Sequence, residues 1–133
     1  MNVFIVEDSE AMRESLRSIL SEFHDIRIAG YAADEAGAIE HINALLPDVV
    51  ILDLNLQSGS GVAVLKNIKK HHAAIKVMVL TNCTDEFYVD ACKHANADYF
   101  FDKSFQFMQV REVFLNWDRT SQLDNKFDSK PAN

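Results

Sequence analysis

Four short apolar runs in this chain each end in side chains that could bind a metal ion or a phosphate group. Asp53 ends one run, Glu7 and Asp8 follow another, Thr81 ends a third, and Lys103 follows a fourth. Packing alone gives no reason for a carboxylate, a hydroxyl and an amine at these places. In an open parallel sheet the carboxyl ends of the strands share one edge, and ligands bind in the crevice outside it. The sequence therefore predicts that these side chains meet at one site.

The chemistry expected of such a site involves a cation and a phosphate group. Three neighbouring carboxylates repel one another unless some are protonated or a cation lies between them. The predicted ligands are oxygen atoms, with no His or Cys among them, which favours Mg²⁺ over zinc or copper. Thr81 and Lys103 could contact phosphoryl oxygens, and Asp53 could accept a phosphoryl group as a nucleophile.

The hydrophobic pattern predicts five strands that alternate with five helices. Short apolar runs give the strands, and apolar residues three and four apart give the helices. The expected strands are 3–6, 27–31, 49–53, 77–80 and 99–101, and the expected helices are 9–23, 34–46 with Asp34 as N-cap, 62–72, 85–95 and 106–117. Such alternation predicts an α/β fold, a doubly wound five-stranded parallel sheet with helices on both faces. We expect a domain over residues 1–119 and a mobile polar tail over 120–133.

Composition narrows the class of protein. The chain has 133 residues and a formal net charge of −7, which suits a single domain and argues against direct nucleic-acid binding. No apolar stretch approaches the ~20 residues that span a bilayer, and no signal-peptide pattern stands at the start, so we expect a cytoplasmic protein without membrane contact. Cys83 and Cys92 are expected to be free thiols.

These motifs together resemble the receiver domain of two-component response regulators, from about Val3 to Trp117. The resemblance is carried by Val3-Phe4-Ile5-Val6-Glu7-Asp8-Ser9, by 47–55 (Pro-Asp-Val-Val-Ile-Leu-Asp-Leu-Asn), by Gly61, by Val79-Leu80-Thr81 and by Asp102-Lys103. It implies a flavodoxin-like (βα)5 sandwich and a signalling switch that catalyses only its own phosphorylation and dephosphorylation.

The resemblance also implies roles for the acidic residues. Asp53 would be the phosphoacceptor, and the Mg²⁺ ion would be bound by Glu7, Asp8, Asp53 and the backbone carbonyl of Asn55. A sensor histidine kinase or a histidine phosphotransfer protein would supply the phosphoryl group. If the acids do share a pocket, Mg²⁺ should stabilise the fold, and Asp53→Ala should stabilise the metal-free protein by relieving repulsion.

A switch is implied by the same resemblance. Thr81 and Lys103 would contact the phosphoryl group, and Thr81 and Phe100 would then move and alter the face made by the fourth helix, fifth strand and fifth helix. Candidates for that face are Tyr88, Lys93, Arg111 and Glu112. The output would be binding to an unidentified downstream protein, or formation of a homodimer.

Three positions depart from the common receiver pattern. Ser104 stands where many receivers have proline, and a cis Lys103–Ser104 bond would cost ~3 kcal/mol relative to trans. Gln57 stands where proline is also frequent, which should loosen the loop after Asp53. Phe100 replaces the common tyrosine, so the switch could operate by packing alone.

Other functions stay open at this point. The stretch 25–30 and the missing proline after Lys103 also suit the receiver portion of a DNA-binding transcriptional regulator. A Mg²⁺-dependent phosphohydrolase could use Asp53 as its nucleophile, although Asn55 stands where one such family has an aspartate. A flavin-binding module is disfavoured, because acids crowd the edge where the flavin phosphate would bind.

Overall fold

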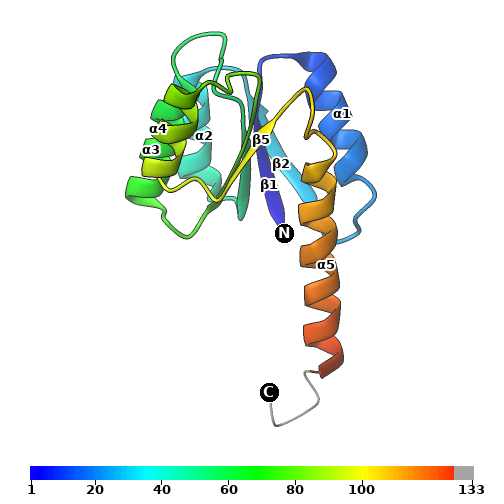
Figure 1. Cartoon of the computed structure of the whole chain (residues 1–133). Coiled ribbons are helices and arrows are strands. Elements are labelled where there is room, and N and C mark those ends of the chain that lie inside the picture. Colours follow the sequence, from blue (N-terminus) through cyan, green and yellow to red (C-terminus); the bar gives the residue numbers. More distant parts are fainter. Residues whose placement is uncertain (128–133) are drawn as a thin grey trace.

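The computed structural model describes residues 1–127, with side chains described up to residue 118. Five strands and five helices alternate along this part of the chain (Figure 1). The strands are β1 (Asn2–Val6), β2 (Arg27–Ala32), β3 (Val49–Leu52), β4 (Lys76–Thr81) and β5 (Tyr99–Asp102). The helices are α1 (Glu10–Leu20), α2 (Glu35–Leu45), α3 (Gly61–His71), α4 (Glu86–His94) and α5 (Gln109–Phe127).

The strands form one parallel sheet in the order β2-β1-β3-β4-β5. Helices α1 and α5 cover one face of the sheet, and α2, α3 and α4 cover the other (Figure 1). The predicted doubly wound α/β sandwich is therefore confirmed. Among the described helices, none is long and apolar enough to cross a membrane.

The inner strands read as continuous apolar runs because both of their faces are buried. In β1, Val3 and Ile5 pack under α1 and α5, whereas Phe4 and Val6 pack under α2 and α3. Strand β3 alternates in the same way. Full burial of such a side chain contributes ~1.5–3 kcal/mol, so the two cores hold the strand ends in a fixed register.

Side-chain caps begin four of the helices at the edge where the strands end. The Ser9, Asp34, Ser60 and Asp85 side chains each accept a backbone N–H from the first turn of the following helix. The predicted N-cap at Asp34 is confirmed, with the Gly37 N–H at 2.7 Å. These caps fix where each strand-to-helix loop ends, and the loops carry the candidate site.

Helices α1 and α5 have boundaries that differ by several residues from the sequence prediction. Helix α1 ends at Leu20, and Phe23 still reaches the core through the turn that follows, which extends the apolar stripe beyond the helix. Helix α5 begins at Gln109 because the Asp102 carboxylate accepts the Ser104 N–H at 2.8 Å and the Gln106 side chain accepts the Asp102 N–H at 2.9 Å, which forms a turn first.

The same helix extends past the predicted end at residue 117. It continues to Phe127, and the sequence has no proline from there back to its start. The predicted mobile tail at 120–133 therefore begins inside a helix, and residues 128–133 lie outside the described part of the chain. A domain boundary at residue 119 stays a prediction.

Candidate functional site

The carboxyl ends of β1, β3, β4 and β5 bring the predicted site residues together. Glu7, Asp53 and Thr81 are buried, and Asp8 is exposed. Sheet hydrogen bonding continues up to the site, because the Asp53 N–H donates to the Val6 carbonyl at 2.9 Å. The Lys103 N–H donates in the same way to the Thr81 carbonyl at 2.9 Å. The predicted convergence at one edge is therefore present.

Asp53 accepts hydrogen bonds on both of its carboxylate oxygens. The Thr81 hydroxyl donates to Oδ1 at 2.8 Å, and the Asn55 backbone N–H reaches the same oxygen at 3.2 Å. Lys103 Nζ donates to Oδ2 at 2.8 Å and also to Glu7 Oε1 at 2.7 Å. The Lys103 ammonium thus bridges the carboxylates at the ends of β1 and β3.

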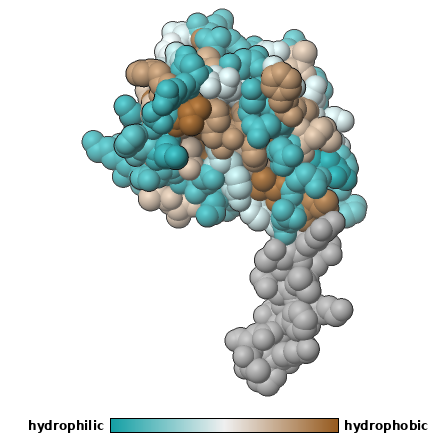
Figure 2. All heavy atoms as spheres, in the orientation of Figure 1, coloured by the Kyte–Doolittle hydropathy of each residue, from teal (hydrophilic) through white to brown (hydrophobic). Residues whose placement is uncertain are grey.

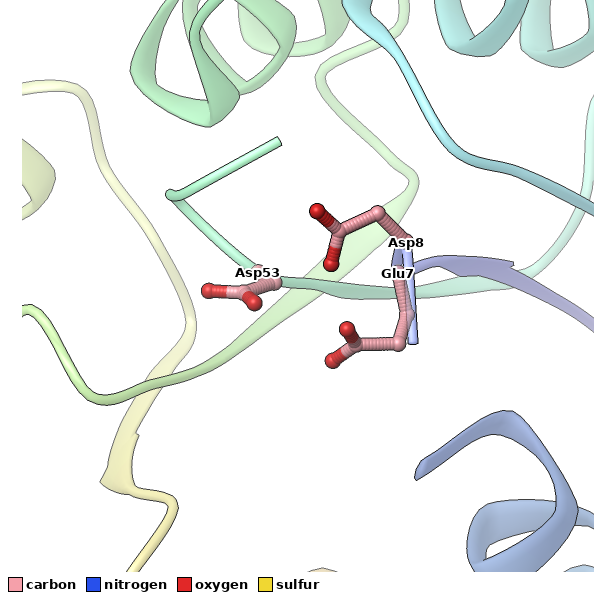
Figure 3. A group of neighbouring side chains, drawn as sticks. All are labelled: Glu7, Asp8 and Asp53. Carbon is pink, nitrogen blue, oxygen red and sulfur yellow. The ribbon is translucent and has the colours of Figure 1, made fainter. Parts of the chain in front are cut away.

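Glu7, Asp8 and Asp53 form an acidic cluster. One carboxylate oxygen from each lies within 4.8 Å of the other two, and Figure 3 shows the three side chains converging from two strand ends. Three carboxylates and one ammonium leave two formal negative charges at this edge. The donors are hard oxygens, and the exposed Asp8 leaves the cluster open to water, as Mg²⁺ requires. The residues present therefore fit a magnesium ion.

Burial and charge shift the pKa values of two of these groups. Burial raises the pKa of Glu7 above its usual value, and this effect outweighs the hydrogen bonds from Lys103 and Ser9, which lower it. Burial by itself would lower the pKa of Lys103, but the hydrogen bonds and charges of Asp53 and Glu7 outweigh it, and the pKa is raised. Lys103 is therefore cationic at neutral pH, and a second cation at the cluster would favour ionised Glu7.

The loop that follows Asp53 is tightly held. Asn55 pairs with Ser60 in an antiparallel bridge, and the Gly61 N–H donates to the Leu54 carbonyl at 3.0 Å. A Cβ atom at Gly61 would overlap the Asp53 carbonyl and the Leu54 backbone, so glycine is needed for this close approach.

Gln57 does not loosen this loop, contrary to the expectation from its place in the receiver pattern. Its backbone N–H donates to the Ala33 carbonyl at 3.1 Å, a hydrogen bond that proline could not make. All peptide bonds in the described residues are trans, and Lys103–Ser104 is among them.

The predicted switch residues lie on β4 and on the edge strand β5. Thr81 Oγ1 contacts Asp53 and also accepts the Cys83 N–H at 3.1 Å. Phe100 is half-buried and packs against the core beneath α4, on the same side as Tyr88. Phe100 thus packs against the same core cluster as Tyr88 of α4.

Arg111, a candidate for the α4–β5–α5 face, pairs with a residue that follows α1. Its Nε donates to Glu22 Oε1 at 3.1 Å, which turns it toward the end of α1 rather than toward α4. The rotation of α5 about its own axis determines which way the Arg111 side chain points, and the sequence spacing alone did not predict that rotation.

The cysteines are both free, as predicted, and both lie within the described residues. Cys92 is buried in the core, and burial raises the pKa of its thiol to about 11. It is therefore protonated at neutral pH and unreactive.

Sequence reasoning missed Arg13 as a support of this site. Its Nη1 donates to the Glu7 carbonyl at 2.8 Å, and its guanidinium lies 4.6 Å from the centre of the Tyr31 ring. Arg13 thus fixes the β1–α1 loop that carries the acidic pair. Its place on the polar side of a helix gave no signal of this contact.

Comparison with known proteins places the chain in a family. The family model described as the response regulator receiver domain matches residues 3–114. The chain belongs to the response regulator receiver domain family. Curated relatives of this receiver include the DNA-binding transcriptional activator EvgA of Escherichia coli, 27% identical over 103 residues, which are 77% of this chain and 50% of EvgA. The DNA-binding transcriptional activator DevR/DosR of Mycobacterium tuberculosis is 30% identical over 92 residues, 68% of this chain and 42% of that protein.

Solved structures give the same family. The response regulator domain of Thermotoga maritima CheB superposes with a TM-score of 0.76 at 29% identity, covering 90% of this receiver and 94% of that chain. The isolated REC domain of RcsB from Salmonella enterica superposes with a TM-score of 0.79 at 21% identity, covering 90% of this receiver and 88% of that chain. A similarity at this identity shows the fold alone. The receiver spans half or less of the length of the curated relatives EvgA and DevR/DosR.

The family gives the receiver its general function. It is the receiver domain of a two-component response regulator, a phosphorylation-responsive signalling switch. Receiver domains take phosphoryl groups from histidine kinases and bind Mg²⁺ at an acidic pocket, and this receiver has an acidic cluster of Glu7, Asp8 and Asp53. The family match favours this function over a phosphohydrolase or a flavin-binding module.

Proposed function

We propose that this receiver is phosphorylated on Asp53, in a Mg²⁺-dependent reaction with a sensor histidine kinase or a histidine phosphotransfer protein. The observation that carries the proposal is the environment of Asp53, whose two oxygens accept from Thr81, Lys103 and the Asn55 N–H beside the two acids that follow β1. These are the donors that a phosphoryl group on Asp53 would need for its own oxygens.

The metal would be held by the Glu7, Asp8 and Asp53 carboxylates and by the backbone carbonyl of Asn55. When bound, Mg²⁺ supplies positive charge that neutralises the phosphoryl oxygens during transfer. The receiver's own residues do the rest. Lys103 offers a second positive charge, the Thr81 hydroxyl offers a hydrogen bond, and burial of Asp53 keeps bulk water away.

The reaction itself is a phosphoryl exchange between two side chains. A carboxylate oxygen of Asp53 attacks the phosphorus of the donor phosphohistidine, the new P–O bond forms, and the P–N bond breaks, returning the imidazole to the donor. The product is an acyl phosphate, which water hydrolyses to restore the carboxylate. The receiver therefore acts on its own aspartate and turns over no separate substrate.

The switch would start at Thr81. Its hydroxyl donates to Asp53 in the unphosphorylated receiver, and on phosphorylation it would donate to a phosphoryl oxygen instead. Phe100, half-buried beneath α4, would repack into the space that Thr81 leaves. Because Phe100 has no hydroxyl, packing alone would pass the change to the surface.

The output would be read on the α4–β5–α5 face. Phe87 is 74% exposed on α4, and Phe105 and Met108 are 88% and 57% exposed before α5. Figure 2 shows apolar atoms between the polar groups on the α4 and α5 sides of this view. A downstream protein or a second copy of the chain would bind there.

Intact-mass spectrometry after incubation with acetyl phosphate and Mg²⁺ tests this proposal. We expect one added phosphoryl group, and none in Asp53→Asn or in the presence of a chelator. An adduct of the same size on Asp53→Asn would show that another residue accepts the group.

A second candidate is the receiver portion of a DNA-binding transcriptional regulator. It is supported by the names of EvgA and DevR/DosR and by the length of those relatives that this chain leaves unmatched. DNA binding would then come from another part of a longer polypeptide, since these 133 residues carry a net charge of −7. The mass of the natural protein, isolated from its source, decides between the two: a mass near 15.1 kDa argues against this candidate.

A further inference from the structure

The loop 54–60, which follows Asp53, lies against the start of α2, and Glu35 holds it there. Glu35 Oε1 accepts the Ser60 backbone N–H at 2.8 Å, and the Glu35 backbone N–H donates to the Ser58 carbonyl at 3.0 Å. One residue thus contacts the far end of the loop through both its side chain and its backbone. Glu35 lies outside the acidic cluster and is not placed to bind the same ion.

The loop backbone packs directly on this side chain. Gly59 has a φ of +83°, and a Cβ atom there would overlap Cβ and Oε1 of Glu35. Glycine is therefore required at 59 both by its backbone conformation and by its contact with Glu35. The Gln57 N–H, bonded to the Ala33 carbonyl, adds a further attachment to the same segment.

The Ser60 contact with Glu35 is linked to the proposed magnesium site by the antiparallel bridge between Ser60 and Asn55. Ser60 pairs with Asn55, whose N–H contacts Asp53 Oδ1, and the Ser60 hydroxyl caps α3 through the Val62 N–H at 3.1 Å. Leu54 and Leu56 anchor the near half of the loop in the core. Asn55 itself is exposed, so its orientation depends on these attachments.

We propose that Glu35 is a positioning residue of the magnesium site, which it serves by holding the loop 54–60 so that the Asn55 carbonyl faces the carboxylates. The inference rests on the proposed function, because it takes Asn55 as a ligand. Without the Glu35 side chain, the Ser60 end of the loop loses one attachment, so part of its ordering must accompany ion binding, and the cost of that ordering weakens binding.

The test measures Mg²⁺ binding and loop exchange in Glu35→Ala, Glu35→Gln and the parent protein. Calorimetry should show ~tenfold weaker Mg²⁺ binding in Glu35→Ala, the loss expected for one part-buried hydrogen bond to a carboxylate, and a change within about twofold in Glu35→Gln, which keeps Oε1. In the metal-free protein, hydrogen exchange over 54–61 should be faster in Glu35→Ala alone. Glu86→Ala is the matched control, because Glu86 begins α4 as Glu35 begins α2 and is exposed.

Several results would overturn the inference. Unchanged Mg²⁺ affinity and loop exchange in Glu35→Ala, with only a lower Tm, would leave Glu35 a structural residue. Glu35→Gln matching Glu35→Ala would assign the effect to charge rather than to position. If Glu35→Ala does not fold, Glu35→Asp, one methylene shorter, should show the same loss of affinity. A parent protein that binds no Mg²⁺ would overturn the proposed function as well, and this is seen before any variant is compared.

Discussion

Lys103 bridges the carboxylates of Glu7 and Asp53, and replacing it tests whether Mg²⁺ can supply the positive charge that its ammonium supplies. Its Nζ lies 2.7 Å from Glu7 Oε1 and 2.8 Å from Asp53 Oδ2, and the side chains of Lys103, Glu7 and Asp53 are 11%, 3% and 7% exposed. Lys103→Met keeps the length of the side chain and removes the ammonium. Removing one member of a buried ion pair costs ~3–5 kcal/mol, because the other member stays buried without its partner.

The expected result is a large loss of stability that Mg²⁺ reverses. A loss of ~3 kcal/mol lowers the Tm of a domain of this size by ~10 °C in a chelator. Saturating Mg²⁺ should raise the Tm of Lys103→Met by more than it raises that of the parent, since the ion takes over the place of the ammonium between the carboxylates. Circular dichroism melts with and without Mg²⁺ measure both changes.

A matched control is available on the surface. Lys76 pairs with Asp98 at 4.0 Å and is 57% exposed, so Lys76→Met should change stability by less than ~1 kcal/mol. Equal melting of Lys103→Met and Lys76→Met in the chelator would refute the reasoning. So would an equal Mg²⁺-induced rise in Tm for Lys103→Met and for the parent.

Three further substitutions test separate parts of the site. Glu7→Gln should raise the Tm in a chelator and abolish the Mg²⁺-induced rise in Tm, because the raised pKa of Glu7 means that its charge opposes folding at pH values above that pKa. As the pH falls through this pKa, protonation of Glu7 removes the cost, so the difference in Tm between parent and variant should shrink. Over the same pH range, Mg²⁺ binding by the parent should weaken. Thr81→Val should lower the free energy of unfolding by ~1 kcal/mol and still allow phosphorylation of Asp53. Phosphorylation should no longer change the NMR chemical shifts of α4, since valine cannot donate to a phosphoryl oxygen. Phosphorylation-induced shifts like those of the parent would contradict the role of Thr81. Gly61→Ala should cost ~3 kcal/mol in urea unfolding, because its Cβ overlaps the Asp53 carbonyl, and a cost below ~1 kcal/mol would contradict that contact.

The arrangement of the site could be predicted from the sequence because two local patterns determine it. Apolar runs that alternate with helices require a parallel sheet, and a parallel sheet brings the residues after each run to one edge. Asp53, Thr81 and Lys103 were therefore placed correctly without knowledge of any contact between them.

Contacts that depend on loop shape or helix rotation could not be predicted in this way. The hold of Glu35 on Ser60 spans 25 residues and depends on a positive φ at Gly59, and the Arg111–Glu22 pair depends on how α5 is rotated. The same limit affects the expected gain in stability for Asp53→Ala. The ammonium of Lys103 already offsets the repulsion, and that substitution also leaves three hydrogen-bond donors, on Asn55, Thr81 and Lys103, without their acceptor.

The central claim is that Asp53 accepts the phosphoryl group, and mapping the modified residue tests it most directly. The receiver is incubated with acetyl phosphate and Mg²⁺, the acyl phosphate is reduced with borohydride to the alcohol, and tandem mass spectrometry locates the resulting homoserine. We predict homoserine at position 53 alone. Reduction at Asp8 or Glu7, or at no position in a folded protein that binds Mg²⁺, would contradict the account.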